Sequence, residues 1–240
     1  MASIEQNALE FYRYVCFKIT PEDTESMNKD NDYKAAMKKC AKTAYSDLRR
    51  GPLTGMGNMR KEKGDDVYWR YRSAIEDLIV HRITCNTVDD DPALFKIESQ
   101  NSYNRWHKKT CDEMRSISSS EKYCVSSYLN NKFSYGLAQK WLNITLKNML
   151  VAGLWDAKMR KLKKWLHVPV DDYVLKGAKS SKEPYGLNIP KNELPERGTW
   201  SSWDDYEKEY IKFQDLVREE TTSKGFKCPI DWEFDAWIAF

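Results

Sequence analysis

The sequence predicts a mostly α-helical fold, on three observations. Glycine and proline are scarce, at 10 and 8 of 240 residues, whereas an all-β chain needs them at its many tight turns. Long stretches are rich in lysine, glutamate, leucine and alanine, which favour helix. Apolar residues also recur at intervals of three and four, the period of an amphipathic helix. A chain of this length forms one large domain or two lobes that share a cleft.

Composition excludes several classes of protein. Hydrophobic residues make up 41% of the chain, charged residues 31%, and the mean hydropathy is -0.76, so the chain is neither membrane-embedded nor disordered. The N-terminus has no uncharged apolar run and the six cysteines form no C-x-x-C pair, so we expect a cytoplasmic protein with free thiols. The net charge of +3 does not by itself indicate a polyanionic partner. We expect no metal, no cofactor and no membrane partner.

The first fifty residues predict two helices. Over residues 4–19, four apolar residues share one helical face, and Pro21 ends that helix. The acidic stretch over residues 21–32 predicts a loop. A second helix, basic on its outer face, is expected over residues 33–50, where a Gly-Pro pair ends it.

A flexible basic loop is expected over residues 51–64, where four glycines accompany Arg60, Lys61 and Lys63. Aromatic and arginine residues follow at 68–72. Because lysine and arginine contact phosphates while aromatic faces stack on exposed bases, we predict that these three cations bind DNA. The alternative is a solvated loop followed by aromatic residues that pack in the core.

The middle of the chain predicts helices without evident chemistry. These cover residues 73–85 and 103–117, with an acidic turn between them. His107 and Cys111 lie one helical turn apart, but no second pair with ligand spacing exists, which favours a structural role over a metal site. Residues 184–195 contain three prolines and are too irregular for a helix.

A helix near the C-terminus is expected from an apolar stripe. Its members recur at intervals of 3, 4, 3 and 4 residues: Trp203, Tyr206, Tyr210, Phe213 and Val217. Ser202 and Asp205 resemble a capping box at its start. We expect the stripe to be buried against the N-terminal helix.

Two segments have the residue types of a chemical site. Ser134 opens a turn of small residues, Gly136 and Ala138 among them, that leads directly into an apolar helix. Backbone N–H groups at such a turn favour an anion such as a DNA phosphate. In the second segment, Pro169 ends a basic helix and Asp171 lies at or near the N-cap of the next one. Backbone donors fix a carboxylate in that position.

Together these segments resemble the signature of the helix-hairpin-helix DNA glycosylase superfamily. Gly136-Leu137-Ala138-Gln139-Lys140 is similar to the family's Gly-x-Gly-x-Lys turn, with Ala138 in place of the second glycine. Asn143 and Leu146 match residues common in the helix that follows. The second segment, Pro169-Val170-Asp171 with Val174 and Lys176, resembles the family's Pro-Val-Asp-x-x-Val-x-Arg pattern.

The resemblance implies a two-lobed helical fold with a central cleft. Lobe A would comprise residues 35–155, with the hairpin at 128–152, and lobe B would comprise residues 1–34 plus 156–240. By resemblance, Asp171 is the catalytic carboxylate, and Lys140 occupies the position that carries the Schiff-base lysine in members with lyase activity. No four-cysteine cluster site follows, which excludes the iron–sulfur branch.

The resemblance also implies a partner and a substrate. The partner is double-stranded DNA, whose backbone would contact Ser134, Gly136, Ala138 and Gln139. Small bacterial members include antiphage enzymes that excise glucosylated hydroxymethylcytosine from phage DNA, and this chain resembles that group. We expect a monomer that releases the base with activated water rather than through a Schiff base.

Three other functions stay open on the sequence. A non-enzymatic helical protein could bind nucleic acid through the same turn and basic residues. A metal-dependent nuclease would use some of the abundant carboxylates, although no Asp-x-Glu-x-Lys pattern is present. An adaptor or toxin-like protein would bind a partner through the aromatic C-terminus.

Overall fold

The computed structural model describes residues 4–29, 32–49, 53, 55–85, 87–88, 91–123, 125–129, 132–195 and 199–239. Helices account for 73% of the described residues, which confirms the prediction of a mostly α fold. The only strands in these ranges are β1 (Thr87–Val88) and β2 (Asp91–Pro92), which pair antiparallel. In the described part of the chain no helix is long and apolar enough to span a membrane.

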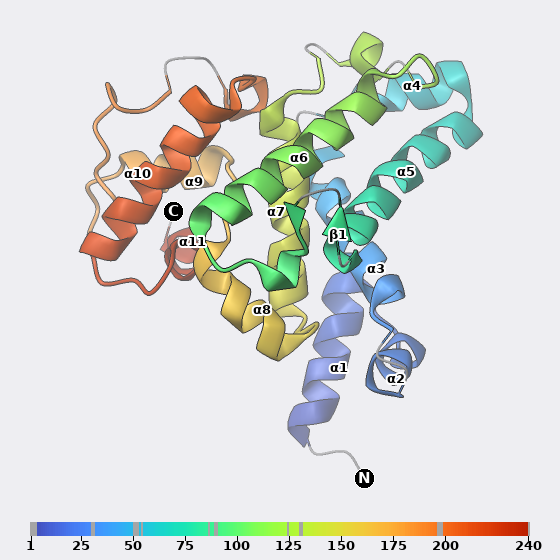
Figure 1. Ribbon diagram of the computed structural model, residues 1–240, viewed down its shortest axis with the longest axis horizontal. Helices are drawn as coiled ribbons and strands as arrows, with labels where there is room; N and C mark the ends of the chain where they lie inside the picture. The colour runs from blue at the N-terminus through green and yellow to red at the C-terminus, as the bar shows by residue number, and fades with distance from the viewer. Residues whose placement is uncertain are drawn as a thin grey trace.

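Eleven α-helices make up most of the described chain (Figure 1). In order they are α1 (Ile4–Phe17), α2 (Pro21–Lys29), α3 (Lys34–Arg49), α4 (Met56–Lys63), α5 (Asp65–Thr84), α6 (Gln100–Ser119), α7 (Tyr135–Val151), α8 (Asp156–Leu162), α9 (Asp172–Lys179), α10 (Lys212–Ser223) and α11 (Pro229–Ala239). Short 3-10 segments lie at Leu94–Lys96, Val125–Tyr128, Lys163–Trp165 and Trp200–Ser202, and a π-helical turn at Tyr206–Ile211 leads directly into α10.

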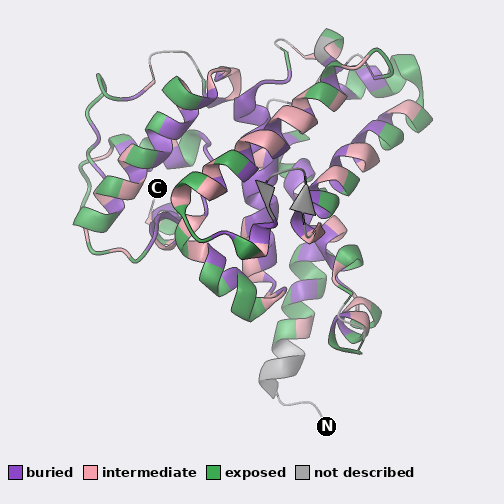
Figure 2. Ribbon diagram, viewed as in Figure 1, coloured by how far each residue is buried: buried purple, intermediate pink, exposed green. Residues whose placement is uncertain are grey.

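Helix α7 is the centre of the core. It packs on α3 and α6, with α5 beyond them on one side and α9, α10 and α11 on the other (Figure 1). Thirteen of its seventeen residues are buried, including Trp141 and Met149 (Figure 2). An apolar helix of this kind is stable only when neighbours cover it on nearly all sides. The buried hydrophobic residues form one cluster with members from both predicted lobes, and the division into two lobes stays a prediction.

The predicted loop at residues 21–32 is wrong, because α2 occupies Pro21–Lys29. A reciprocal cap starts this helix: the Thr20 backbone N–H donates to the Asp23 carboxylate at 2.6 Å, and the Asp23 N–H donates to the Thr20 hydroxyl at 3.3 Å. Proline is favoured at the first helical position, where its missing N–H costs nothing. Pro21 therefore begins a helix as well as following the end of α1.

The predicted flexible loop at residues 51–64 is also wrong over its second half. Helix α4 covers Met56–Lys63 and is held to the body by Met56 and Met59, which are buried. Gly64 separates it from α5 with a φ of 84°, a conformation that glycine adopts without strain. Helix α5 begins at Asp65 and so extends well before the helix expected at residues 73–85.

The C-terminal aromatic stripe is buried, as predicted, but not against the N-terminal helix. Tyr206 and Tyr210 contact His107 of α6, and the Tyr210 hydroxyl accepts a hydrogen bond from Asn143 of α7 at 2.8 Å. Asp205 caps the start of this segment by accepting hydrogen bonds from the backbone N–H groups of Glu207 and Lys208, at 3.1 and 3.0 Å. The Glu209 carboxylate reaches back and accepts from the N–H groups of Asp204 and Asp205, at 2.7 and 2.8 Å. The capping box expected with Ser202 is therefore not formed.

Candidate functional site

Asp171 is the N-cap of α9, as predicted. Its carboxylate accepts a hydrogen bond from the Val174 backbone N–H at 2.9 Å, and its backbone is extended, with φ at -147°. The residue is 9% exposed. A carboxylate held by a backbone donor at a helix start has one preferred orientation. Asp171 therefore presents a fixed charge at the edge of the core.

Two glutamines hold the extended segment before Asp171. The Gln139 side chain accepts a hydrogen bond from the Val170 N–H and donates to the Val170 carbonyl, both at 3.3 Å. Gln214 of α10 does the same for Val168, at 3.1 and 2.9 Å. These amides replace the backbone partners that a strand would have. The position of Asp171 is thus fixed from both α7 and α10.

Lys140 and Asp171 are brought together. They are 31 positions apart in the sequence, yet the Lys140 Nζ lies 3.4 Å from a carboxylate oxygen of Asp171. Both side chains are 12% exposed, and the Lys140 ammonium also lies 4.6 Å from the centre of the Trp200 ring. Limited exposure and an aromatic face strengthen this ion pair relative to one in open solvent.

The pair opens onto a cavity of about 590 Å³, which we call the Asp171 cavity. Its lining residues come from α3, α7, the segment before α9, and α9 and α11: Asp47, Lys140, Ile144, Lys147, Asn148, Pro169, Asp171, Asp172, Tyr173 and Trp237. The rings of Tyr173 and Trp237 lie 5.0 Å apart and are each about half-exposed. The cavity volume lies within the about 300–1,000 Å³ range of small-ligand sites.

A second ion pair lies beside the first and was not predicted. The Lys147 Nζ donates to Glu233 at 2.6 Å, and the Glu233 side chain is only 1% exposed. Burial raises the pKa of Glu233, the ammonium of Lys147 opposes that shift, and the charge of Asp171 adds to it. The other carboxylate oxygen of Glu233 is buried without a hydrogen-bond partner. The one signal in the sequence is that Glu233 stands between Trp232 and Phe234, but its partner Lys147 is 86 positions away.

The predicted anion-binding turn is corrected. Ser134, Gly136, Ala138 and Gln139 are all buried, and they lie in the cap and first turns of α7 rather than in an exposed hairpin. The donors are already used: the Leu137 N–H binds the Ser134 hydroxyl at 3.2 Å, and the Gly136 N–H binds a backbone carbonyl of the 200–203 segment at 3.0 Å.

The close approach of the 200–203 segment explains why residue 136 is a glycine. A Cβ at position 136 would lie 1.9 Å from the carbonyl oxygen of Trp200. Glycine is therefore needed here for contact with another part of the chain, not with a phosphate. Over its described residues, the hairpin expected at residues 128–152 is not formed by two helices, because α7 alone occupies Tyr135–Val151 of that range.

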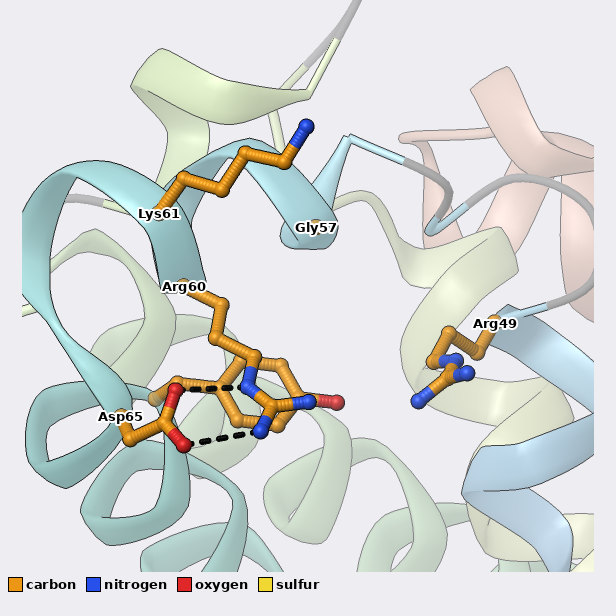
Figure 3. A pocket seen from close by; sticks show the side chains of 6 residues that line it. Arg49, Gly57, Arg60, Lys61 and Asp65 are labelled. Atoms are coloured by element: carbon orange, nitrogen blue, oxygen red, sulfur yellow. Dashed lines mark hydrogen bonds and ion pairs between the residues drawn. The ribbon is translucent and has the colours of Figure 1, made fainter.

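The three predicted basic residues lie on α4 and are exposed. Arg60 and Lys61 line a second pocket, of about 550 Å³, with Arg49 at the end of α3 (Figure 3). Lys63 is not among the residues that line it. Their assignment to DNA stays a prediction.

A buried polar network joins α6, α7 and the C-terminal stripe. His107 hydrogen-bonds to Tyr206 at 2.9 Å and to Asn143 at 3.0 Å, and its ring lies 4.8 Å from that of His167. Burial lowers the pKa of His107 to about 3 and the pKa of His167 well below its ordinary value. Both rings are therefore neutral at pH 7. This supports the structural role predicted for His107.

The ranges that the structure describes contain no group of three or more histidine, cysteine, aspartate or glutamate side chains placed to hold a metal ion. The five described cysteines are free, and Cys124 lies outside the described residues. The chain matches no protein-family model, no curated protein and no solved structure. Its function must therefore be inferred from the site.

Proposed function

We propose that this protein is a DNA glycosylase that cleaves the N-glycosidic bond of an extruded, modified base and leaves an abasic site. One observation carries the proposal: Lys140 and Asp171, which the sequence resemblance assigned to one active site, lie 3.4 Å apart at the wall of a cavity large enough for a base. The two residues come from separate segments of the resemblance, and the fold brings them together.

The chemistry follows from the fixed carboxylate. As the bond between the sugar and the base breaks, positive charge develops at the anomeric carbon, and Asp171 stabilises it electrostatically. The base leaves with the electrons of the broken bond, and water bonds to that carbon and gives its proton to the carboxylate. The carboxylate then releases this proton through solvent to the departed base, which restores the ionised Asp171. The base reaches this position only after it leaves the duplex. Tyr173 and Trp237 offer half-exposed ring faces to it.

The cavity favours a base that carries a substituent. Its volume of about 590 Å³ leaves space beyond a pyrimidine ring, and its lining combines charged groups with the neighbouring rings of Tyr173 and Trp237. We propose α-glucosyl-hydroxymethylcytosine, as found in phage DNA, as the first substrate to test. Lys140 contacts the Asp171 carboxylate in the proposed mechanism and does not form a Schiff base.

The test compares duplexes with cytosine, hydroxymethylcytosine or its glucosylated form, each incubated with the pure protein, with and without chelator. Alkaline cleavage reports abasic sites. We expect release of the modified base, insensitive to chelator, and a loss of about 10²-fold or more in the D171N variant, because one electrostatic contact is removed. The matched control is D172N, the neighbouring exposed carboxylate that lines the same cavity.

Each alternative gives a different result. Strand cleavage that chelator abolishes indicates the metal-dependent nuclease. DNA binding without abasic sites on any duplex indicates the non-enzymatic binding protein. A borohydride-trapped adduct that is lost in the K140Q variant indicates Schiff-base chemistry instead of activated water. Full activity of D171N overturns the assignment of the site.

A further inference from the structure

The pocket at the end of α3 has the charges of a phosphate site. We call it the Arg49 pocket. Its volume is about 550 Å³, and its lining residues are Arg49, Gly57, Arg60, Lys61, Asp65 and Tyr68. Figure 3 shows the guanidinium groups of Arg49 and Arg60 pointing toward one another across the opening, with Lys61 on α4 at its edge.

Two of the three cations in this pocket have no ion-pair partner. Arg60 is neutralised by Asp65, which accepts two hydrogen bonds from it at 2.7 and 2.8 Å. Across the described ranges, neither Arg49 nor Lys61 has a carboxylate within ion-pair distance or a side-chain hydrogen bond. Two uncompensated cations that share a concave surface attract an anion more strongly than the same charges spread over a convex one.

The walls of the pocket suit a phosphate next to a sugar and base. Gly57 also lines the pocket, and an added Cβ there would meet nothing within 4 Å. The Arg60 guanidinium lies 5.8 Å from the ring centre of Tyr68, which is the aromatic residue that lines the pocket. Arginine binds phosphate oxygens through parallel N–H donors, and lysine adds a point charge.

The position of the pocket relates it to the Asp171 cavity. Asp47 lines the Asp171 cavity, and Arg49 lines the Arg49 pocket. These residues are two apart in the last turn of α3, which corresponds to a rise of about 3 Å and a rotation of about 200°. Both hollows therefore border the last turn of α3.

We infer that Arg49 and Lys61 bind a backbone phosphate that flanks the extruded nucleotide, while its base occupies the Asp171 cavity. This inference rests on the proposed function. It adds Arg49 to the predicted DNA contacts and separates Lys61, inside the pocket, from Lys63, outside it on the same helix.

Fluorescence anisotropy with the D171N background measures binding without excision. We expect R49A and K61A each to weaken binding to a duplex by about tenfold or more, the range of a charged hydrogen bond, and to lower the salt slope by about 1. The matched control, K63A, should change affinity less than threefold. Thermal unfolding of each variant checks that the exposed substitutions leave the fold intact.

A single methylphosphonate, which removes one backbone charge, identifies the phosphate. When it is placed beside the target nucleotide, it should lower the affinity of the D171N protein for the duplex about tenfold. It should not lower the affinity of the D171N/R49A protein further, because the two changes remove the same contact. Equal binding by R49A, K61A and K63A overturns the inference, even when abasic sites form. If the pocket variants lose affinity but no duplex ever gives an abasic site, the proposed function fails and the phosphate site stands.

Discussion

Gln139 offers a direct test of how the candidate site is positioned. The Q139A change removes four hydrogen bonds: two to the backbone of Val170, one to the Gly136 carbonyl at 2.8 Å, and one from Asn143 at 3.0 Å. Gln139 and Val170 are both fully buried, so water cannot replace the lost partners. Leaving a buried polar group unpaired costs about 1–3 kcal/mol, and the N–H and carbonyl of Val170 both lose a partner. We expect the free energy of unfolding to fall by about 3 kcal/mol.

Urea denaturation at pH 7 measures this loss, with Q214A as the matched control. Gln214 holds Val168 by the same pair of hydrogen bonds and is equally buried, so Q214A should lose a similar stability. The rate of base release should distinguish Q139A from Q214A, because Val170, which Gln139 holds, directly precedes Asp171. We expect Q139A to lower the rate about tenfold more than Q214A, since small displacements of a catalytic group are costly. A stability loss below about 1 kcal/mol would show that the amide does not hold this segment.

Two further predictions concern the core. Because burial lowers the pKa of His107 to about 3 and that of His167 well below normal, the folded protein binds fewer protons than the unfolded chain below pH 6.5. The free energy of unfolding should therefore fall on acidification from pH 6.5, by up to about 1.4 kcal/mol per pH unit for each histidine, and a flat profile between pH 7 and 5 would contradict this. G136A should prevent folding because its Cβ would lie 1.9 Å from a backbone carbonyl, whereas G57A, with open space around it, should raise the melting temperature slightly. Circular dichroism distinguishes these outcomes.

The sequence predicted most of the helices because their signals are local. The buried faces of α3, α6 and α10 follow helical spacing, whereas the face predicted for α1 is wrong at Val15, which is about half-exposed. The two errors at residues 21–32 and 51–64 have a common cause. Both helices are short and polar. Their formation therefore depends less on apolar periodicity than on the cap at Thr20, for α2, and on the buried Met56 and Met59, for α4.

The site could be predicted only in part, for a reason of the same kind. Asp171 was found because an N-cap is a local pattern, and Lys140 because of the resemblance. Glu233 and Gln214 were missed because their partners lie 86 and 46 positions away. Gln139 was assigned to DNA because its neighbours resemble an exposed turn, whereas in the folded chain it is fully buried and bonded to Val170 and Asn143.

Helix α7 contributes side chains both to the buried hydrogen-bond network and to the lining of the Asp171 cavity. Gln139 and Asn143, four residues apart, share the face that hydrogen-bonds to the extended segment and to the aromatic stripe. Lys140 and Lys147, seven apart, share a neighbouring face that lines the Asp171 cavity. Any rotation of α7 that repositions the lysines therefore also breaks buried hydrogen bonds. The network fixes the rotation of α7, and with it the face from which the two lysines reach carboxylates of two distant segments.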